Sequence, residues 1–513
     1  MTSPHSASHS PIQIPRPIAS GYHARKSALR NEILSQRPPG NPVMRLLLRS
    51  FILGSIVLLP GSPQARATPR VQGFIVSTSW APPITDPVID PVDKRGIVAA
   101  IKAGNQPALM AIRDRMVQNA PLSSVDQYLV SLADAGLARI NGDFTASNAA
   151  LDRGLRLVGH HADTTQELNA LLLLGESLRY GNLFLSGDLS GWIERAAWLE
   201  RVYFAPIRAF YKLPNLKFPN LTLLTPLVPA SSITNPSVIA SDEEQMPLLV
   251  TNDDNDGRRV IDVQVQATFF GKSDWALLDT GSLEGVIPRS YVTRYHLPVI
   301  ARSKRGSDGF RRNMSVDYVI VPEIRLGRTV LKNQLFTVAP IPFPVLGLLQ
   351  LGQLRHLTID SAMLRFGPHA PFDCHEPLRA ASLMTGVESR LIFPYELDGH
   401  EDTAALDTGD NTPSILSIRT PALPAHLAER AQLKSVTTVA GKVAYPTTTA
   451  PATVVFPDFT VQDRVKYIQS PMQDTLIPSG ILNHARFSLD MTEHVACLTP
   501  DRVARKFSGK RED

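Results

Sequence analysis

The strongest constraint on this chain is a short stretch that occurs twice. An apolar run ends in Asp279-Thr280-Gly281 at the first position and in Asp407-Thr408-Gly409 at the second. A buried strand followed at once by a carboxylate and a glycine typically delivers the acid to the end of a sheet and then turns sharply. One such tripeptide is common by chance, whereas two after matching apolar runs indicate a repeated unit.

The repeat extends on both sides of these tripeptides. A glycine lies eight residues before each aspartate, so Gly271 and Gly399 share the 128-residue offset of the two aspartates (399 − 271 and 407 − 279). Further on, a residue pair ending in glycine leads to a short strand that ends in aspartate. In the first half these landmarks are Leu346-Gly347 and Asp360, and in the second half they are Ser479-Gly480 and Asp490. The two glycines are 133 residues apart (480 − 347), and the two aspartates are 130 residues apart (490 − 360). The common order indicates a duplicated unit with small insertions.

At these residues the sequence resembles the retropepsin and pepsin group of aspartic proteases, as two retropepsin-like halves fused in one chain. The resemblance covers residues 246–500, with a first lobe at 246–374 and a second at 375–500. It implies an all-β bilobal domain that acts on a peptide or protein substrate. We expect no cofactor.

The resemblance also implies a role for each residue of the repeated loops. Asp279 and Asp407 are the catalytic pair, and Thr280 and Thr408 tie the two loops together. The active-site loops are completed by Gly281 and Ser282 in the first half and by Gly409 and Asp410 in the second. The residues that pack behind these loops are Leu346, Gly347, Ser479 and Gly480.

The chemistry of paired carboxyl groups agrees with this assignment. Peptide hydrolysis needs a base to activate water and an acid to protonate the leaving nitrogen. Two carboxyl groups a few ångströms apart cannot both ionise, so they share one proton and supply both functions.

Two positions depart from the family pattern. The family usually places Ser, Thr or Ala after Asp-Thr-Gly, and Ser282 fits, but the second half has Asp410. An ionised Asp410 cannot donate a hydrogen bond to the catalytic carboxylate and adds repulsion, so we expect a raised pKa of the pair or a damaged site. Ser479 replaces an apolar residue, and we expect looser packing behind Asp407.

The charge of the chain does not predict a nucleic-acid partner. The sequence pI is about 9.1, but residues 1–67 hold eight Lys or Arg and one acid. Without them, 44 basic residues face 46 acidic ones, which leaves a net charge of −2. The excess of basic residues therefore lies in residues 1–67, and the rest of the chain has no basic patch that would indicate binding to nucleic acid.

The N-terminal region has the layout of an export signal. Residues 44–67 place arginines first, an apolar stretch next and Ala65-Arg66-Ala67 last, which is typical of a cleaved signal peptide. We therefore expect a periplasmic or secreted protein, with an uncleaved membrane anchor as the alternative. Residues 1–43 should be disordered and suggest a non-native start, with Met44 as the initiator. Residues 68–94 are proline-rich and predict a linker.

Residues 95–212 change in character to Ala- and Leu-rich segments with helical spacing, and they predict an all-α helical-hairpin domain. The turn Gly142-Asp143-Phe144 resembles the inter-helix turn of a tetratricopeptide repeat, so binding of a partner protein through this domain stays open. A proline-rich linker at 213–245 follows, and a charged tail occupies 501–513. The fold class is therefore multidomain, with a helical domain before the β domain.

Several smaller features complete the predictions. Cys374 and Cys497 are the two cysteines, and their pairing as a disulfide stays open. The glycine-bearing stretches 305–312 and 439–442 are either flaps over the cleft or ordinary surface hairpins. We expect no metal site, because the acidic stretch 252–257 lacks the final glutamate of a calcium loop and His160-His161 is an isolated pair.

The leading hypothesis is an exported aspartic endopeptidase whose helical domain recruits a substrate or partner. One alternative is an inactive protein that holds extended peptides in the same cleft. A second alternative is a helical scaffold with a degenerate protease domain. The survival of both aspartates and both threonines favours the first.

We predict that the mature chain begins near Thr68, because the tripartite leader ends in Ala65-Arg66-Ala67. N-terminal sequencing of protein recovered from the exported fraction checks this. A mature form that begins at Met1 or Met44 would contradict it.

Overall fold

The structure is a computed structural model that describes residues 92–118, 121–158, 166–210, 212, 223–252, 259–306, 314–438 and 441–501. Several predicted features lie outside these residues. They are the disordered start at 1–43, the signal peptide at 44–67, nearly all of the 68–94 linker, His160-His161, part of the 213–245 linker, most of the 252–257 stretch, the tips of both predicted flaps and all but the first residue of the tail.

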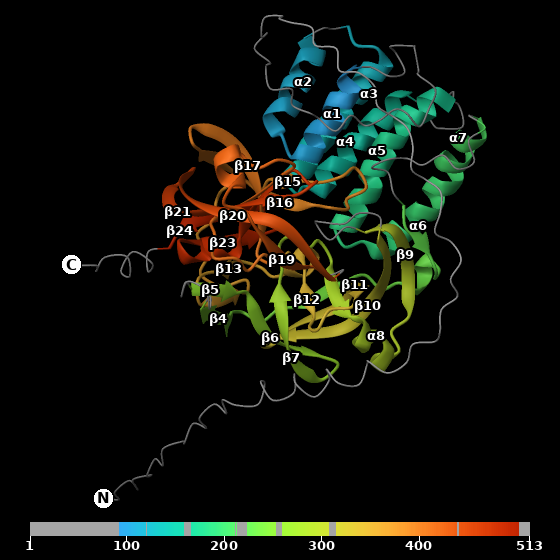
Figure 1. The fold of residues 1–513 in the computed structure, drawn as a ribbon. Helices are drawn as coiled ribbons and strands as arrows, with labels where there is room; N and C mark the ends of the chain where they lie inside the picture. The colour runs from blue at the N-terminus through green and yellow to red at the C-terminus, as the bar shows by residue number, and fades with distance from the viewer. Residues whose placement is uncertain are drawn as a thin grey trace, which may run out of the picture. The chain divides into compact units, whose positions relative to one another are not determined.

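The N-terminal part is helical, and its helices come in consecutive pairs joined by tight turns (Figure 1). Gly104, Gly142 and Gly187 occupy these turns with φ values of 64°, 76° and 79°, a backbone conformation that favours glycine. Sequence reasoning found only the turn at Gly142. The helices are α1 Val92–Ala103, α2 Gln106–Gln118, α3 Ser124–Ile140, α4 Phe144–Val158, α5 Gln166–Leu185, α6 Leu189–Leu199 and α7 Ala205–Phe210, with a π-helical turn at Glu200–Phe204 before α7.

The first large sheet has the strand order β1-β9-β10-β6-β7-β12-β8-β11-β2. Its centre is the β6–β7 hairpin, whose turn at Phe270 and Gly271 has positive φ at both residues. The strands are β1 Thr225–Pro226, β2 Ser237–Ile239, β6 Gln264–Phe269, β7 Lys272–Leu278, β8 Gly285–Pro288, β9 Val299–Gly306, β10 Met314–Leu326, β11 Thr329–Ala339 and β12 Val345–Leu346, with α8 Arg289–Tyr295 and α9 Leu348–Leu351 between them.

The second large sheet has the order β15-β16-β17-β22-β18-β21-β20-β19. The β16–β17 hairpin turns at Asp398-Gly399, both with positive φ, and an Asp-Gly dipeptide between apolar strands is the residue pair most typical of such a tight turn. The strands are β15 Ala380–Ala381, β16 Arg390–Leu397, β17 His400–Asp407, β18 Leu416–Thr420, β19 Gln432–Thr438, β20 Gly441–Phe456, β21 Phe459–Gln469 and β22 Asp474–Pro478, with α10 Ala425–Ala428 and the 3-10 turn η5 Ser479–Asn483.

The two sheets share one pattern of pairing around the aspartates. In the first, β7 pairs in parallel with β12, β12 pairs antiparallel with β8, and β8 pairs in parallel with β11. In the second sheet the same three orientations recur. There β17 pairs in parallel with β22, β22 pairs antiparallel with β18, and β18 pairs in parallel with β21. The strand that carries each aspartate therefore lies beside the strand that leads to the later glycine.

A third sheet joins segments from both halves in the order β24-β23-β13-β14-β3. The junction is the antiparallel pair β13–β23, where the hydroxyls of Thr358 and Ser488 lie 3.2 Å apart. The strands are β3 Glu244–Pro247, β13 Leu357–Ile359, β14 Met363–Phe366, β23 Ala485–Asp490 and β24 Val495–Pro500, and β4 Leu249–Asn252 pairs separately with β5 Arg259–Asp262.

The helical and β parts share one continuous cluster of buried apolar residues. Trp192 of α6 stacks on Phe184 of α5 and also meets Tyr318 of β10 edge-on, with ring centroids 4.5 and 5.8 Å apart. The prediction of a helical region followed by a β region is confirmed (Figure 1). Among the described helices, none combines the length and the hydrophobicity needed to cross a bilayer.

The cysteine pairing that the sequence left open is a disulfide between Cys374 and Cys497, with Cα atoms 5.7 Å apart. It fastens the segment after β14 to β24 of the third sheet and closes a loop with a sequence separation of 123 residues. A cross-link over so long a loop restricts the unfolded chain strongly.

We predict that reduction of the disulfide lowers the free energy of unfolding by roughly 2–5 kcal/mol. Urea unfolding with and without reductant measures the change. The matched control is the double variant Cys374→Ala/Cys497→Ala, whose unfolding should not respond to reductant. Equal stability of the oxidised and reduced wild type would contradict the prediction.

Candidate active site

The two aspartates stand at the ends of equivalent strands. Asp279 follows β7 and donates its backbone N–H to the carbonyl of Leu346, at 2.9 Å. Asp407 is the last residue of β17 and is in register with Pro478 of β22. Each loop is therefore held by the strand that leads to the later glycine. The structure brings the predicted loop residues and the predicted packing residues together.

Thr280 and Thr408 form hydrogen bonds that cross from one loop to the other. Each hydroxyl accepts the backbone N–H of the other threonine, at 3.0 and 3.1 Å. Each hydroxyl also donates to a carbonyl of the opposite strand, Thr280 to Leu406 at 3.0 Å and Thr408 to Leu278 at 2.7 Å. Both threonines are completely buried. Separating the loops would leave buried polar groups unpaired, at about 1–3 kcal/mol for each group.

The crossing places each carboxyl group against the glycine of the other loop. A Cβ added to Gly281 would lie 2.5 Å from Cγ of Asp407, and one added to Gly409 would lie 2.5 Å from Cγ of Asp279. Any side chain at these positions would displace the opposite carboxyl group. Glycine is required here because of this close approach.

Each carboxyl group is oriented by its own loop. Oδ1 of Asp279 accepts the backbone N–H groups of Gly281 and Ser282, at 2.9 and 3.2 Å. Burial and the neighbouring Asp407 carboxylate raise the pKa of Asp279 to about 8, although these two backbone bonds lower it. Each of the two carboxyl groups affects the pKa of the other, so their protonation is coupled.

Asp407 lies in a more charged environment. Its Oδ1 accepts the N–H groups of Gly409 and Asp410, both at 3.1 Å. Burial and the Asp410 carboxylate raise the pKa of Asp407, whereas Arg419 and Arg390 lower it. The effect of Asp410 has the direction that the sequence predicts.

Asp410 is itself paired, which the sequence did not reveal. Nζ of Lys466 lies 3.8 Å from its Oδ1, and both side chains are mostly buried. Lys466 on β21 therefore offsets part of the negative charge that Asp410 brings beside Asp407. The repulsion expected from the sequence is present but reduced.

Two arginines near Asp407 were also missed by sequence reasoning. Arg390 Nη1 donates to Asp474 Oδ2 at 3.0 Å, and Arg419 Nη1 lies 3.6 Å from the same oxygen. Arg419 and Asp474 are cross-strand partners on β18 and β22. In the sequence, the only sign of these arginines is that each is a charged residue in a largely apolar strand. Their position near Asp474 and Asp407 follows from the pairing of β18 with β22, which the sequence does not show.

The expectation that Ser479 loosens the packing behind Asp407 is wrong. Ser479 is completely buried, and its hydroxyl donates to the carbonyl of Ile261 at 2.9 Å. Its N–H donates to the carbonyl of Asp410 at 2.9 Å. The serine therefore ties the second active-site loop to β5 of the first half. Gly480 is closely packed as well, since an added Cβ would lie 2.4 Å from the carbonyl oxygen of Ser414.

The first half is packed in the equivalent way. Leu346 is completely buried, and a Cβ on Gly347 would lie 2.5 Å from the carbonyl oxygen of Glu284. Ser282 turns its hydroxyl to that same carbonyl, at 2.8 Å. In this structure the Ser282 hydroxyl therefore stabilises the loop backbone.

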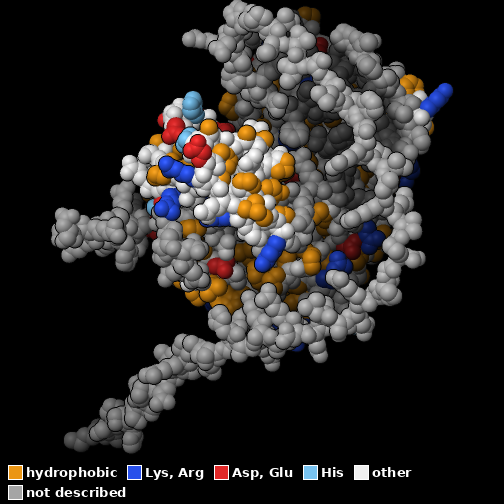
Figure 2. All heavy atoms as spheres, in the orientation of Figure 1, with side chains coloured by type: hydrophobic (Ala, Val, Ile, Leu, Met, Phe, Trp, Pro, Cys, Tyr) orange, Lys and Arg blue, Asp and Glu red, His pale blue; other side chains and the backbone are white. Residues whose placement is uncertain are grey.

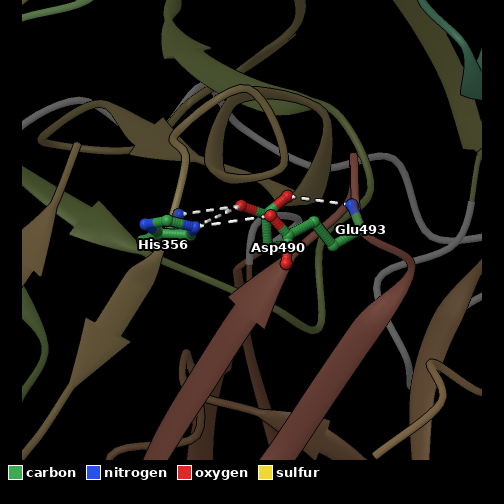
Figure 3. Close-up of side chains that lie close together, drawn as sticks. All are labelled: His356, Asp490 and Glu493. Atoms are coloured by element: carbon green, nitrogen blue, oxygen red, sulfur yellow. Dashed lines mark hydrogen bonds and ion pairs between the residues drawn. The ribbon is translucent and has the colours of Figure 1, made fainter. Parts of the chain in front are cut away.

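His356, Asp490 and Glu493 form a cluster with the spacing of metal ligands, at the end of β23 (Figure 3). Arg355 already supplies a positive charge there, because its Nε donates to Asp490 at 2.8 Å and its Nη2 donates to Glu493 at 3.1 Å. Burial alone would raise the pKa of Asp490, but the bonds from Arg355 and from nearby backbone amides lower it overall. The cluster is best explained as a structural ion pair.

The predicted flap regions belong to the antiparallel hairpins β9–β10 and β19–β20. On the second hairpin Leu433 is 73% exposed. Figure 2 shows hydrophobic side chains gathered over the face that carries β20 and β19. The assignment of either hairpin as a flap stays a prediction.

Comparison with known proteins bears on the first half of the site. A family model described as aspartyl protease matches residues 265–359, which include Asp279 and Leu346-Gly347. Residues 265–359 therefore form an aspartyl protease-like domain.

A solved structure is also similar to part of the chain. It is a retropepsin-like aspartic protease from Rickettsia conorii, with 14% sequence identity and a TM-score of 0.18. The match covers 26% of this chain and 92% of that one. No curated protein sequence matches.

The raised pKa of Asp279 predicts how stability depends on pH. The folded state holds this proton up to a pH of about 8, whereas the unfolded chain releases it near a pH of about 4. The stabilisation is therefore fully present below the lower value and is lost as the pH rises through the upper one. Asp279→Asn removes the titration, so the variant should gain stability relative to wild type across this window, by a few kcal/mol at most.

Urea unfolding of both proteins in a pH series measures this difference. Asp398→Asn is a matched control in an exposed turn, and its curve should run parallel to that of the wild type. A stability difference between Asp279→Asn and wild type that is constant across the series would contradict the prediction.

Proposed function

We propose that this protein is an aspartic endopeptidase that hydrolyses peptide bonds with a water molecule activated between Asp279 and Asp407. The observation that carries the proposal is the crossed arrangement of the two loops. Each carboxyl group lies against the glycine of the opposite loop, and the crossed threonine bonds hold both loops in register. This arrangement supports a shared proton, which general acid–base hydrolysis requires.

The charges around the pair favour one distribution of roles. Asp407 has Arg390 and Arg419 lowering its pKa, so it is the better candidate for the ionised base. The pKa of Asp279 is raised without an opposing cation, so Asp279 carries the proton. In the first step Asp407 accepts a proton from water, the hydroxyl oxygen bonds to the peptide carbonyl carbon, and Asp279 protonates the carbonyl oxygen. In the second step the C–N bond breaks and the leaving nitrogen takes the proton held by Asp407, while one hydroxyl of the tetrahedral intermediate returns its proton to Asp279 as the new carboxyl group forms.

The upward shift of both pKa values bears on the working pH. Catalysis needs the pair with one proton, and the second ionisation is shifted upward by burial and by repulsion within the pair. We therefore propose activity that extends from acid toward neutral pH and falls once the shared proton is lost. Lys466 and the two arginines keep the first ionisation accessible in spite of Asp410.

The other parts of the chain fit an exported enzyme with an additional binding domain. We interpret the matching pairing order of the two large sheets as a duplicated retropepsin-like unit. The leader at 44–67 supports export. The paired helices of α1 to α6 support a tetratricopeptide-like recruiter of a partner protein.

A second candidate function is peptide binding without hydrolysis in the same cleft. The observation that favours it is Asp410, which places a third carboxylate beside the pair and raises the pKa of Asp407. The exposed Leu433 of the β19–β20 hairpin would suit contact with an extended peptide in either case.

We predict that Asp279→Asn and Asp407→Asn each abolish cleavage of a mixed peptide library by the mature chain. Each substitution removes one ionisable partner at nearly unchanged volume, so the fold should persist. Mass spectrometry of the products measures cleavage, and circular dichroism checks folding. Asp398→Asn makes the same chemical change in an exposed turn and should cleave like the wild type. Wild-type activity in either active-site variant would rule out the proposed pair.

Asp410→Ser separates the two candidate functions. In an active enzyme it should shift the acid limb of the rate profile to lower pH, because a carboxylate that raises the pKa of Asp407 is replaced by a donor. An inactive wild type that cleaves peptides only after this substitution would instead identify the native protein as a peptide-binding protein.

A further inference from the structure

A cavity of about 360 Å³ lies where the helical part meets the β part. Its wall includes two of the inter-helix turns, at Gly142 and Gly187. It also includes Leu283, which follows the first active-site loop, and Leu348, which follows Gly347. The volume is at the small end of the range for small-molecule sites, about 300–1,000 Å³.

Arg139, in the last turn of α3, forms part of this wall and is 1% exposed. Its Nη1 donates to the carbonyls of Met384 and Leu178, at 2.8 and 3.3 Å. Its Nε and Nη2 have no hydrogen-bond partner within the described residues. A completely buried guanidinium group with two unused donors is costly unless an anion compensates it.

The described part of the chain provides no such anion. Burial lowers the pKa of Arg139 to about 9, and no acidic side chain acts to raise it. Among the described residues of the wall, the one carboxylate is that of Asp143, whose Oδ1 accepts the N–H of Ala146 at 2.8 Å. That carboxylate is used at the start of α4. The positive charge of Arg139 is therefore not matched by the protein.

The rest of the wall indicates what kind of anion would fit. His494 has a buried Nδ1 without a partner in the described residues, and this nitrogen can donate a second hydrogen bond in the tautomer that carries a proton on it. The rest of the wall combines uncharged serine, threonine and glutamine side chains with apolar ones, and the apolar ones include Leu185, Leu283, Leu378 and Leu391. A strongly hydrated anion such as phosphate would lose its water against these leucines, whereas an apolar group attached to a carboxylate would bury there favourably.

We propose that this cavity binds a small apolar carboxylate, with the carboxylate on Arg139 and the apolar group among the leucine side chains. A guanidinium group suits a carboxylate because its parallel N–H groups match the two oxygens. Neither Asp279 nor Asp407 lines this cavity, and the proposal does not depend on protease activity.

The position of the cavity links it to the first active-site loop. Leu348 donates its N–H to the carbonyl of Ser282 at 2.9 Å, and Leu349 donates to the carbonyl of Leu283 at 2.8 Å. A bound carboxylate would pack against this segment from the side of the helical part. Binding would thus stabilise the junction between the two parts of the chain.

The test is calorimetric titration of the mature full-length chain with two carboxylates. Octanoate represents a free aliphatic acid, and N-acetyl-leucyl-leucine represents the C-terminal carboxylate of a peptide. Octanol is the neutral control. We expect saturable binding of at least one carboxylate, no saturable binding of octanol, and a higher melting temperature in the presence of the bound acid.

Two variants locate the site. Arg139→Met keeps the length and apolar character of the side chain but removes the guanidinium group. This variant should bind the carboxylate at least about tenfold more weakly than the wild type. Ala380→Leu adds volume to the wall while leaving Arg139 in place, and it should also weaken binding. Circular dichroism establishes that each variant is folded.

Binding of octanoate identifies a free acid as the ligand class, and binding of N-acetyl-leucyl-leucine alone identifies a peptide terminus. Absence of saturable binding of both acids up to millimolar concentration would overturn the proposal. Equal binding by octanol, or unchanged binding in the folded Ala380→Leu variant, would overturn it as well. None of these outcomes bears on the catalytic pair, which the Asp→Asn variants test separately.

Discussion

The crossed hydrogen bonds of Thr280 and Thr408 are the constraint on which the rest of the site depends. They are buried and reciprocal, and they join two loops that lie 128 residues apart in sequence. Because each loop is anchored to the opposite strand, the carboxyl groups of Asp279 and Asp407 are forced together at the glycines. The repulsion between the two carboxyl groups does not separate the loops, because separation would leave several buried polar groups without hydrogen-bond partners.

The two halves of this site are not electrostatically equivalent. Asp279 is surrounded mainly by backbone donors, whereas Asp407 also lies near Arg390, Arg419 and Asp410. The added charges largely compensate one another, because Asp474 pairs with both arginines and Lys466 pairs with Asp410. In the proposed mechanism, this asymmetry assigns the proton to Asp279 and the role of base to Asp407.

The helical part is integrated with the β part by packing and by polar contacts. The apolar core runs through both, and the guanidinium of Arg139 donates to the backbone of the 383–387 turn. At the same place the backbones of Gly181 and Gly386 approach so closely that a Cβ on Gly181 would lie 2.5 Å from the nitrogen of Gly386. The helical and β parts are therefore held together by close backbone contact as well as by apolar packing.

The sequence by itself determined the helical and β regions, the hairpin at Asp398-Gly399, both aspartate turns and the glycines behind them. These features are encoded by local periodicity, turn chemistry and repetition, which a single chain displays directly. Tertiary structure alone decided the pairing of Cys374 with Cys497, the support of Asp410 by Lys466 and the bond from Ser479 to Ile261. Each of these joins residues far apart in sequence, and their environment depends on strand register and burial, which no local pattern records.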